Sequence, residues 1–151
     1  MKKRIYLDDV RTPVDQDWVV VRSYDEFVAA VKDIGISNIE TVSLDHDLGD
    51  SAMQEYHNNV SPNYTLDYSN ITEKTGLDCA KWLIEHWFEL NASEDYDIRQ
   101  MRFAKTIDFP EVYTHSANPI GSANIVGYVN NFLMNARQPQ TCVRVKIEHT
   151  I

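Results

Sequence analysis

The chain has 151 residues, of which 43% are hydrophobic and 25% charged, so we expect one folded domain of ordinary composition rather than a disordered chain. Fourteen basic residues against 23 acidic ones give a formal charge of −9, which argues against charge-driven binding to duplex nucleic acid. The sequence shows neither a secretory signal nor a long apolar span, so we expect a cytoplasmic protein with no membrane partner.

Strands and helices alternate along the first part of the chain. Runs of β-branched and aromatic residues predict three strands, over 3–9, 18–23 and 39–45. The short connection between the first two strands contains Pro13 and leaves no room for a helix. Ser23 and Glu26 form a capping-box pattern, which predicts a helix over 24–35.

The second part begins with residues 50–73, which have no sustained hydrophobic period and are rich in Asn, Ser, Tyr and acids. Such a segment predicts a long loop, either an insertion or a lid. Thr75 and Asp78 repeat the capping pattern before the next helix, whereas 93–105 could be a short helix or a charged loop. The remaining elements are a fourth strand over 111–116, a helix capped by Ser122, and a final strand at the sheet edge over 141–149.

This order predicts an α/β fold with a mostly parallel, five-stranded sheet. Ligands of such sheets bind outside the carboxyl ends of the strands, near the point where the strand order reverses. Three polar clusters follow predicted strands, at Asp8 and Asp9, at 45–47, and at 114–118. Their common register points to one site.

The acidic residues of these clusters predict a metal site. Converging carboxylates repel one another unless a cation lies between them. Asp8 or Asp9 together with Asp45 could hold a hard divalent ion, Mg²⁺ or alternatively Mn²⁺. The alternative is that Asp9 only turns the chain and Asp47 only caps the following loop.

The other polar residues of the clusters suggest phosphate chemistry. Arg11 could pin the carboxylates in a salt bridge or grip a phosphate. His115 could act as a general acid or base, or it could be structural. His46 is either catalytic or turned outward by the period of the strand. Candidate phosphate-binding residues are Arg11, Thr114, Ser116, Asn118, Gly121 and Ser122.

Four segments carry a resemblance to a known family: LDDVRTP (7–13), SLDHDLG (43–49), TGLDCAKWL (75–83) and THSANPIGSANI (114–125). The acid pair, Asp45 and Thr114 look like the site of a response-regulator receiver domain, with Asp45 at the phosphoacceptor position. Taken together, the segments more closely resemble the cyclic-phosphate-processing receiver domain family. The resemblance points to the following site residues: Asp8, Asp9, Arg11, Asp45, His46, Asp47, His115 and Asn118.

That resemblance implies a single receiver-like, flavodoxin-like domain over residues 1–151, built as a three-layer sandwich. The helix between the first two strands would be missing, and 50–73 would be an insertion after the third strand. The implied substrates are cyclic phosphates, such as those at RNA ends, and the implied setting is RNA repair.

The leading hypothesis is a metal-assisted phosphoesterase that opens a cyclic phosphate on a nucleotide or an RNA end. In it, Asp8 or Asp9 with Asp45 holds the ion, His115 transfers protons, and Asp47 and His46 support the chemistry. The sequence leaves open whether Asp45 acts as a nucleophile or as a ligand of the ion. Two rivals are a degenerate receiver that signals through phosphorylation of Asp45 and a non-catalytic protein that binds cyclic nucleotides or a partner.

Overall fold

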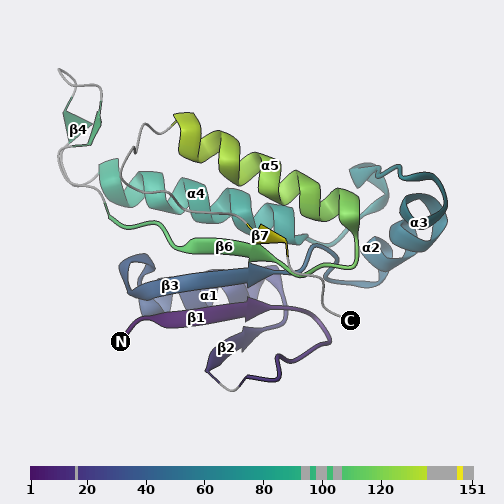
Figure 1. Cartoon of the computed structure of the whole chain (residues 1–151), viewed down its shortest axis with the longest axis horizontal. Helices are drawn as coiled ribbons and strands as arrows, with labels where there is room; N and C mark the ends of the chain where they lie inside the picture. Colours follow the sequence, from purple (N-terminus) through teal and green to yellow (C-terminus); the bar gives the residue numbers. More distant parts are fainter. Residues whose placement is uncertain (16, 93–95, 98–101, 104–106, 136–145, 148–151) are drawn as a thin grey trace.

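The sheet of this protein is parallel and has the strand order β2-β1-β3-β6-β7. A computed structural model of the chain describes residues 1–15, 17–92, 96–97, 102–103, 107–135 and 146–147 (Figure 1). The order is the flavodoxin-like one, which reverses between β1 and β3, so the predicted fold class is confirmed. The strands are β1 (Lys3–Leu7), β2 (Trp18–Val21), β3 (Ile39–Leu44), β6 (Glu111–Thr114) and β7 (Lys146–Ile147).

A second, two-stranded sheet lies within residues 93–105, for which the sequence predicts either a short helix or a charged loop. It pairs β4 (Tyr96–Asp97) with β5 (Arg102–Phe103) in antiparallel fashion. The rest of 93–105 falls outside the described residues, as does the predicted final strand over 141–149 apart from β7. Where it is described, that final strand lies at the sheet edge, as predicted.

Among the described residues, three long helices accompany the sheet: α1 (Tyr24–Ile34), α4 (Gly76–Ala92) and α5 (Pro119–Asn135). Helix α1 begins as predicted, because the Ser23 hydroxyl accepts a hydrogen bond from the backbone N–H of Glu26 at 3.2 Å. The carboxylate of Glu26 turns back to the N–H of Arg22, one residue before the usual capping-box partner. Within the described part of the chain, no helix has the length and apolar character needed to cross a membrane.

The helices and one face of the sheet share one hydrophobic core. The connections through α1, α4 and α5 all step across the sheet in the same direction, and right-handed crossovers therefore place these helices on the same face. The described residues of the β1–β2 connection form no helix, as predicted, so the described part has two layers instead of the expected three. Core side chains of strands and helices include Leu7, Val21, Val42, Val112, Phe27, Leu83, Trp87 and Ile125.

The insertion over 50–73 is largely helical, which corrects the prediction of a loop. Figure 1 shows its helices beyond the carboxyl ends of the strands. Two acids order it: Glu55 accepts hydrogen bonds from Asn59, Asp67 and Asn70, and Glu73 accepts them from Ser51 and Ala52. Its elements are α2 (Asp50–Glu55), a π-helical turn η2 (Tyr56–Val60), α3 (Ser61–Asn63) and a 3-10 turn η3 (Tyr68–Asn70).

Candidate functional site

Three carboxylates meet where β1 and β3 end. Asp8, Asp9 and Asp45 each offer an oxygen, and these oxygens all lie within 4.8 Å of one another. Two backbone hydrogen bonds extend the strand ladders to this point, from Asp8 N to Val21 O (3.1 Å) and from Asp45 N to Leu7 O (2.9 Å). The acidic trio therefore sits where the strand order reverses, the ligand position of this fold.

Asp8 is the anchored member of the trio and is only 1% exposed. Its Oδ1 accepts hydrogen bonds from the backbone N–H of Val10 (2.9 Å) and Arg11 (2.7 Å). Its Oδ2 accepts one from Nε of Arg11 (2.9 Å) and lies 3.2 Å from Nε2 of His115. Burial would raise the pKa of Asp8, but the hydrogen bonds from His115, Arg11 and Val10 together lower it to about 2. These four contacts occupy the roughly four lone-pair sites of the Asp8 carboxylate. Asp9 and Asp45 therefore have the freer oxygens.

The surroundings of Asp45 and Asp9 favour the charged form of each carboxyl less than those of Asp8 do. Burial and then the charge of Asp8 raise the pKa of Asp45 to about 7, although Ser116 and Arg11 act in the opposite direction. Burial and the charge of Asp8 also raise the pKa of Asp9. The surroundings thus stabilise the negative charge of the trio incompletely. A cation bound between these oxygens would supply the missing stabilisation.

Arg11 bridges the trio and β6. Besides its contact with Asp8, its Nη2 donates to the backbone oxygen of His115 at 3.2 Å and lies 3.9 Å from Oδ2 of Asp45. The predicted salt bridge is therefore present, while Nη1 has no hydrogen bond within the described part of the chain. Arg22, which the sequence reasoning missed, fixes this loop by donating to the backbone oxygens of Asp8 (3.1 Å) and Arg11 (2.6 Å).

His115 is enclosed in the protein, with 0% of its surface exposed. Its ring stacks on Tyr6 with the centroids 4.1 Å apart, and Nδ1 lies 2.7 Å from the hydroxyl of Ser43. Both ring nitrogens thus have partners, Ser43 and Asp8, so the geometry favours a positioning role over proton transfer. Ser43 was missed, although its place two residues before Asp45, on the same face of the strand, was a signal for it.

His46 and Asp47 form a second network beside the trio. Nδ1 of His46 lies 2.7 Å from Oδ1 of Asp47, and Nδ2 of Asn118 donates to the same oxygen at 3.2 Å. Nε2 of His46 lies 3.0 Å from the hydroxyl of Tyr68 in the insertion. His46 is therefore turned inward, which excludes the outward alternative. The charge of Asp47 also contributes to the raised pKa of Asp45, so the network and the trio interact.

The start of α5 differs from the predicted one. Pro119 is the first helical residue, and the side-chain oxygen of Asn118 caps the helix by accepting from the N–H of Gly121 at 2.9 Å. The prediction that Ser122 caps this helix is wrong. The N–H of Gly121, predicted to bind phosphate, is already used, and within the described residues the buried hydroxyls of Thr114 and Ser122 have no hydrogen-bond partner.

The structure places most of the predicted site residues in two groups and leaves Gly121, Thr114 and Ser122 outside both. Asp8, Asp9, Arg11, Asp45, His115 and Ser116 surround the trio, and His46, Asp47 and Asn118 form the adjoining network. Gly121 packs against His46, because a Cβ at Gly121 would lie 2.3 Å from Cγ of His46. No contact recorded for the described residues connects the hydroxyls of Thr114 and Ser122 to the trio.

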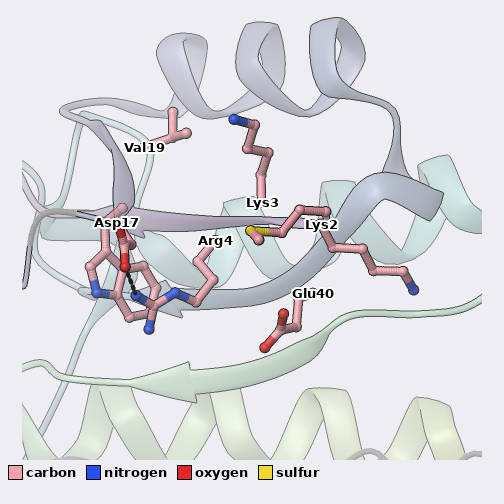
Figure 2. Close-up of a pocket in the computed structure, with 8 residues that line it drawn as sticks. Lys2, Lys3, Arg4, Asp17, Val19 and Glu40 are labelled. Carbon is pink, nitrogen blue, oxygen red and sulfur yellow. Dashed lines mark ion pairs between the residues drawn. The ribbon is translucent and has the colours of Figure 1, made fainter.

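A cavity of about 670 Å³ lies at the opposite, amino-terminal ends of the strands (Figure 2). Basic and acidic side chains share its wall, and Arg4 is already paired with Asp15 at 2.9 Å and lies over the ring of Trp18. The cavity and the trio lie at opposite ends of the strands, and the lining of the cavity mixes basic and acidic side chains. The cavity is therefore not part of the trio's site. Its lining residues are Met1, Lys2, Lys3, Arg4, Asp17, Trp18, Val19 and Glu40.

A family model described as the cyclic-phosphate processing receiver domain matches residues 3–131. The matched range includes the acidic trio, the His46–Asp47 network and the whole insertion. Searches of the curated proteins and of the solved structures gave no match.

Proposed function

Because the chain belongs to the cyclic-phosphate processing receiver domain family, we propose that its acidic site is that of a metal-assisted phosphoesterase. Its substrate would be a cyclic phosphate on a nucleotide or an RNA end. The observation that carries this proposal is the position of the trio, within 4.8 Å and beside the partly free guanidinium of Arg11. Carboxylates with raised pKa suit a cation, and the guanidinium suits a phosphate.

We propose Asp9 and Asp45 as the direct ligands of a divalent ion, Mg²⁺ or Mn²⁺. Asp8 would contribute negative charge and one side of the site, because its own oxygens are already hydrogen-bonded. The donor set fits such an ion, since hard cations prefer carboxylate oxygens. When bound, the ion supplies Lewis-acid polarisation of a phosphoryl oxygen.

The protein's own residues would handle the phosphate and the proton. Hydrolysis forms one P–O bond to a water oxygen, breaks one P–O bond of the ring, and leaves the water's proton on the released hydroxyl. Arg11 would bind a phosphate oxygen through Nη1 while its Nε stays on Asp8. Asp47, 2.7 Å from His46, would accept the water's proton and return it to the leaving oxygen of the ring, and His115 would hold Asp8 in place.

A panel of substrates tests this proposal. It contains 2′,3′-cyclic nucleotides, cyclic dinucleotides and RNA ending in a cyclic phosphate, each with Mg²⁺, Mn²⁺ or a chelator. We expect ring opening that requires the metal and is abolished by Asp45→Asn. The matched control is Asp50→Asn, which neutralises an exposed acid at the start of α2 and should leave turnover unchanged.

Two other outcomes would contradict the phosphoesterase. Phosphorylation of Asp45 by a small phosphodonor, without turnover of any cyclic phosphate, would indicate a signalling receiver. Binding of a cyclic nucleotide with no turnover in any metal, and with affinity unchanged in Asp45→Asn, would indicate a non-catalytic binding protein.

A further inference from the structure

We propose that Tyr68, supplied by the insertion, is a positioning residue of the phosphate site that fixes His46 and, through His46, the carboxylate of Asp47. The proposal rests on the proposed function, because it gives the insertion a part in that same site. In this proposal, residues 50–73 are already folded against one side of the site and do not need to close over it.

The hydrogen bonds around Tyr68 have one consistent direction. Nδ2 of Asn124, on α5, donates to the phenol oxygen at 2.9 Å, and the phenol can in turn donate its own proton to Nε2 of His46, 3.0 Å away. An Nε2 that accepts a hydrogen bond places the proton of the neutral ring on Nδ1. That proton is donated to Asp47 across 2.7 Å. Tyr68 therefore selects one tautomer of His46, the one that can hold Asp47.

The ring of His46 is also held sterically. It is fully buried, with the ring centroid of Tyr68 5.6 Å away and Gly121 against it. A Cβ at position 121 would lie 2.3 Å from Cγ of His46. The close approach of Gly121 restricts the ring, and Tyr68 determines which nitrogen carries the proton.

The insertion holds the Tyr68 side chain in place. Tyr68 lies between Asp67 and Asn70, and both of these donate to the carboxylate of Glu55, at 2.9 Å each. The side chain of Asp67 in turn accepts from the backbone N–H of Ser69 at 2.9 Å and caps the short turn that carries Tyr68. The phenol is thus presented to His46 by a turn with its own hydrogen bonds.

The test compares Tyr68→Phe with the matched control Tyr64→Phe, which removes the hydroxyl of a tyrosine in the same insertion that is 72% exposed. Nitrogen NMR should find His46 of the wild type as the Nδ1–H tautomer. In Tyr68→Phe we expect a mixture of tautomers, and amide exchange in 50–73 about fivefold faster, the effect of losing one hydrogen bond. Tyr64→Phe should match the wild type in both measurements.

Kinetics complete the test. With a substrate from the panel, Tyr68→Phe should lower kcat by about 10- to 100-fold, the usual effect of losing a residue that orients an active-site group, with KM nearly unchanged. Asn124→Ala, which keeps the phenol but removes the donor that orients it, should give an intermediate mixture of tautomers.

An unchanged tautomer in Tyr68→Phe, an equal effect of Tyr64→Phe, or a normal kcat despite a changed tautomer would each overturn the positioning role. The NMR and exchange measurements need no turnover. If the wild type hydrolyses nothing, the phosphoesterase proposal fails, and the tautomer result alone then decides whether Tyr68 fixes His46.

Discussion

Nε2 of His115 lies 3.2 Å from Oδ2 of Asp8, so a buried ring at the end of β6 contacts a carboxylate at the end of β1. The two strands are not neighbours, because β3 lies between them. Ser43, on β3, contacts the other ring nitrogen, and Tyr6, on β1, stacks on the ring. His115 therefore joins three strands beneath the trio and fixes the orientation of its most buried acid.

The first prediction concerns this junction. His115→Phe keeps a ring that can stack on Tyr6 but leaves Asp8 and Ser43 without their nitrogen partners. We expect the free energy of unfolding at pH 7 to fall by about 1–3 kcal/mol, the cost of unsatisfied buried polar groups. Denaturant titration measures it. Ser43→Ala, which removes only one of the two contacts, should cost less, and an unchanged stability of His115→Phe would contradict the junction.

A second prediction follows from the pKa of Asp45, raised to about 7 by burial and then by Asp8. Between the unfolded value near 4 and about 7, the native state binds more protons than the unfolded state. Without metal, the contribution of Asp45 therefore lowers stability as pH rises through this window. Asp45→Asn should be more stable than the wild type by about 2–4 kcal/mol at pH 8, and by less at pH 5. Denaturant titrations in chelator at both pH values test this, and an equal effect at both would contradict it.

Metal binding should show the opposite dependence on pH, which is the third prediction. A carboxylate must lose its proton to bind a cation, so the affinity for Mn²⁺ should fall about tenfold for each pH unit below 7. Calorimetry in two buffers of different ionisation enthalpy should also detect release of about one proton at pH 6. Asp45→Asn should lose the pH dependence together with most of the affinity. An affinity that stays constant from pH 5 to 7 would exclude Asp45 as a ligand.

The position of the site could be predicted from the sequence, because parallel strands end at a common edge. Asp8, Asp9 and Asp45 each follow a strand, and this register brings their oxygens together. Their individual surroundings could not be predicted in this way. That Asp8 is saturated with hydrogen bonds while Asp45 is not depends on the loop around Arg11 and on a ring from β6.

The errors have specific physical causes. Asn118 and Ser122 are both good helix caps by residue type, and Pro119, which suits a first helical position, was the overlooked signal for Asn118. The insertion was expected to be a loop because it lacks a hydrophobic period. Its helices are instead ordered by Glu55 and Glu73, through partners up to 22 residues apart in sequence. No local sequence pattern predicts such contacts, and none predicts the contact between Tyr68 and His46.

The fourth prediction compares two glycines of α5. A methyl group at Gly121 would overlap the ring of His46, whereas one at Gly127 would meet nothing within 4 Å. Gly121→Ala should therefore lower the free energy of unfolding by about 1–3 kcal/mol, the usual cost of overpacking a buried position, and should displace His46 from Asp47.

The matched variant Gly127→Ala should instead raise the free energy of unfolding, by up to about 1 kcal/mol, because alanine favours the helical state more than glycine does. Denaturant titration measures both variants, and the NMR signals of His46 should move only in Gly121→Ala. If both substitutions stabilised the protein equally, the ring of His46 could not lie against α5. The His46–Asp47 network would then lose the support of that helix. We therefore expect Gly121→Ala to lower the free energy of unfolding and Gly127→Ala to raise it, because the first turn of α5 packs against His46 whereas Gly127, in the middle of the helix, has open space beside it.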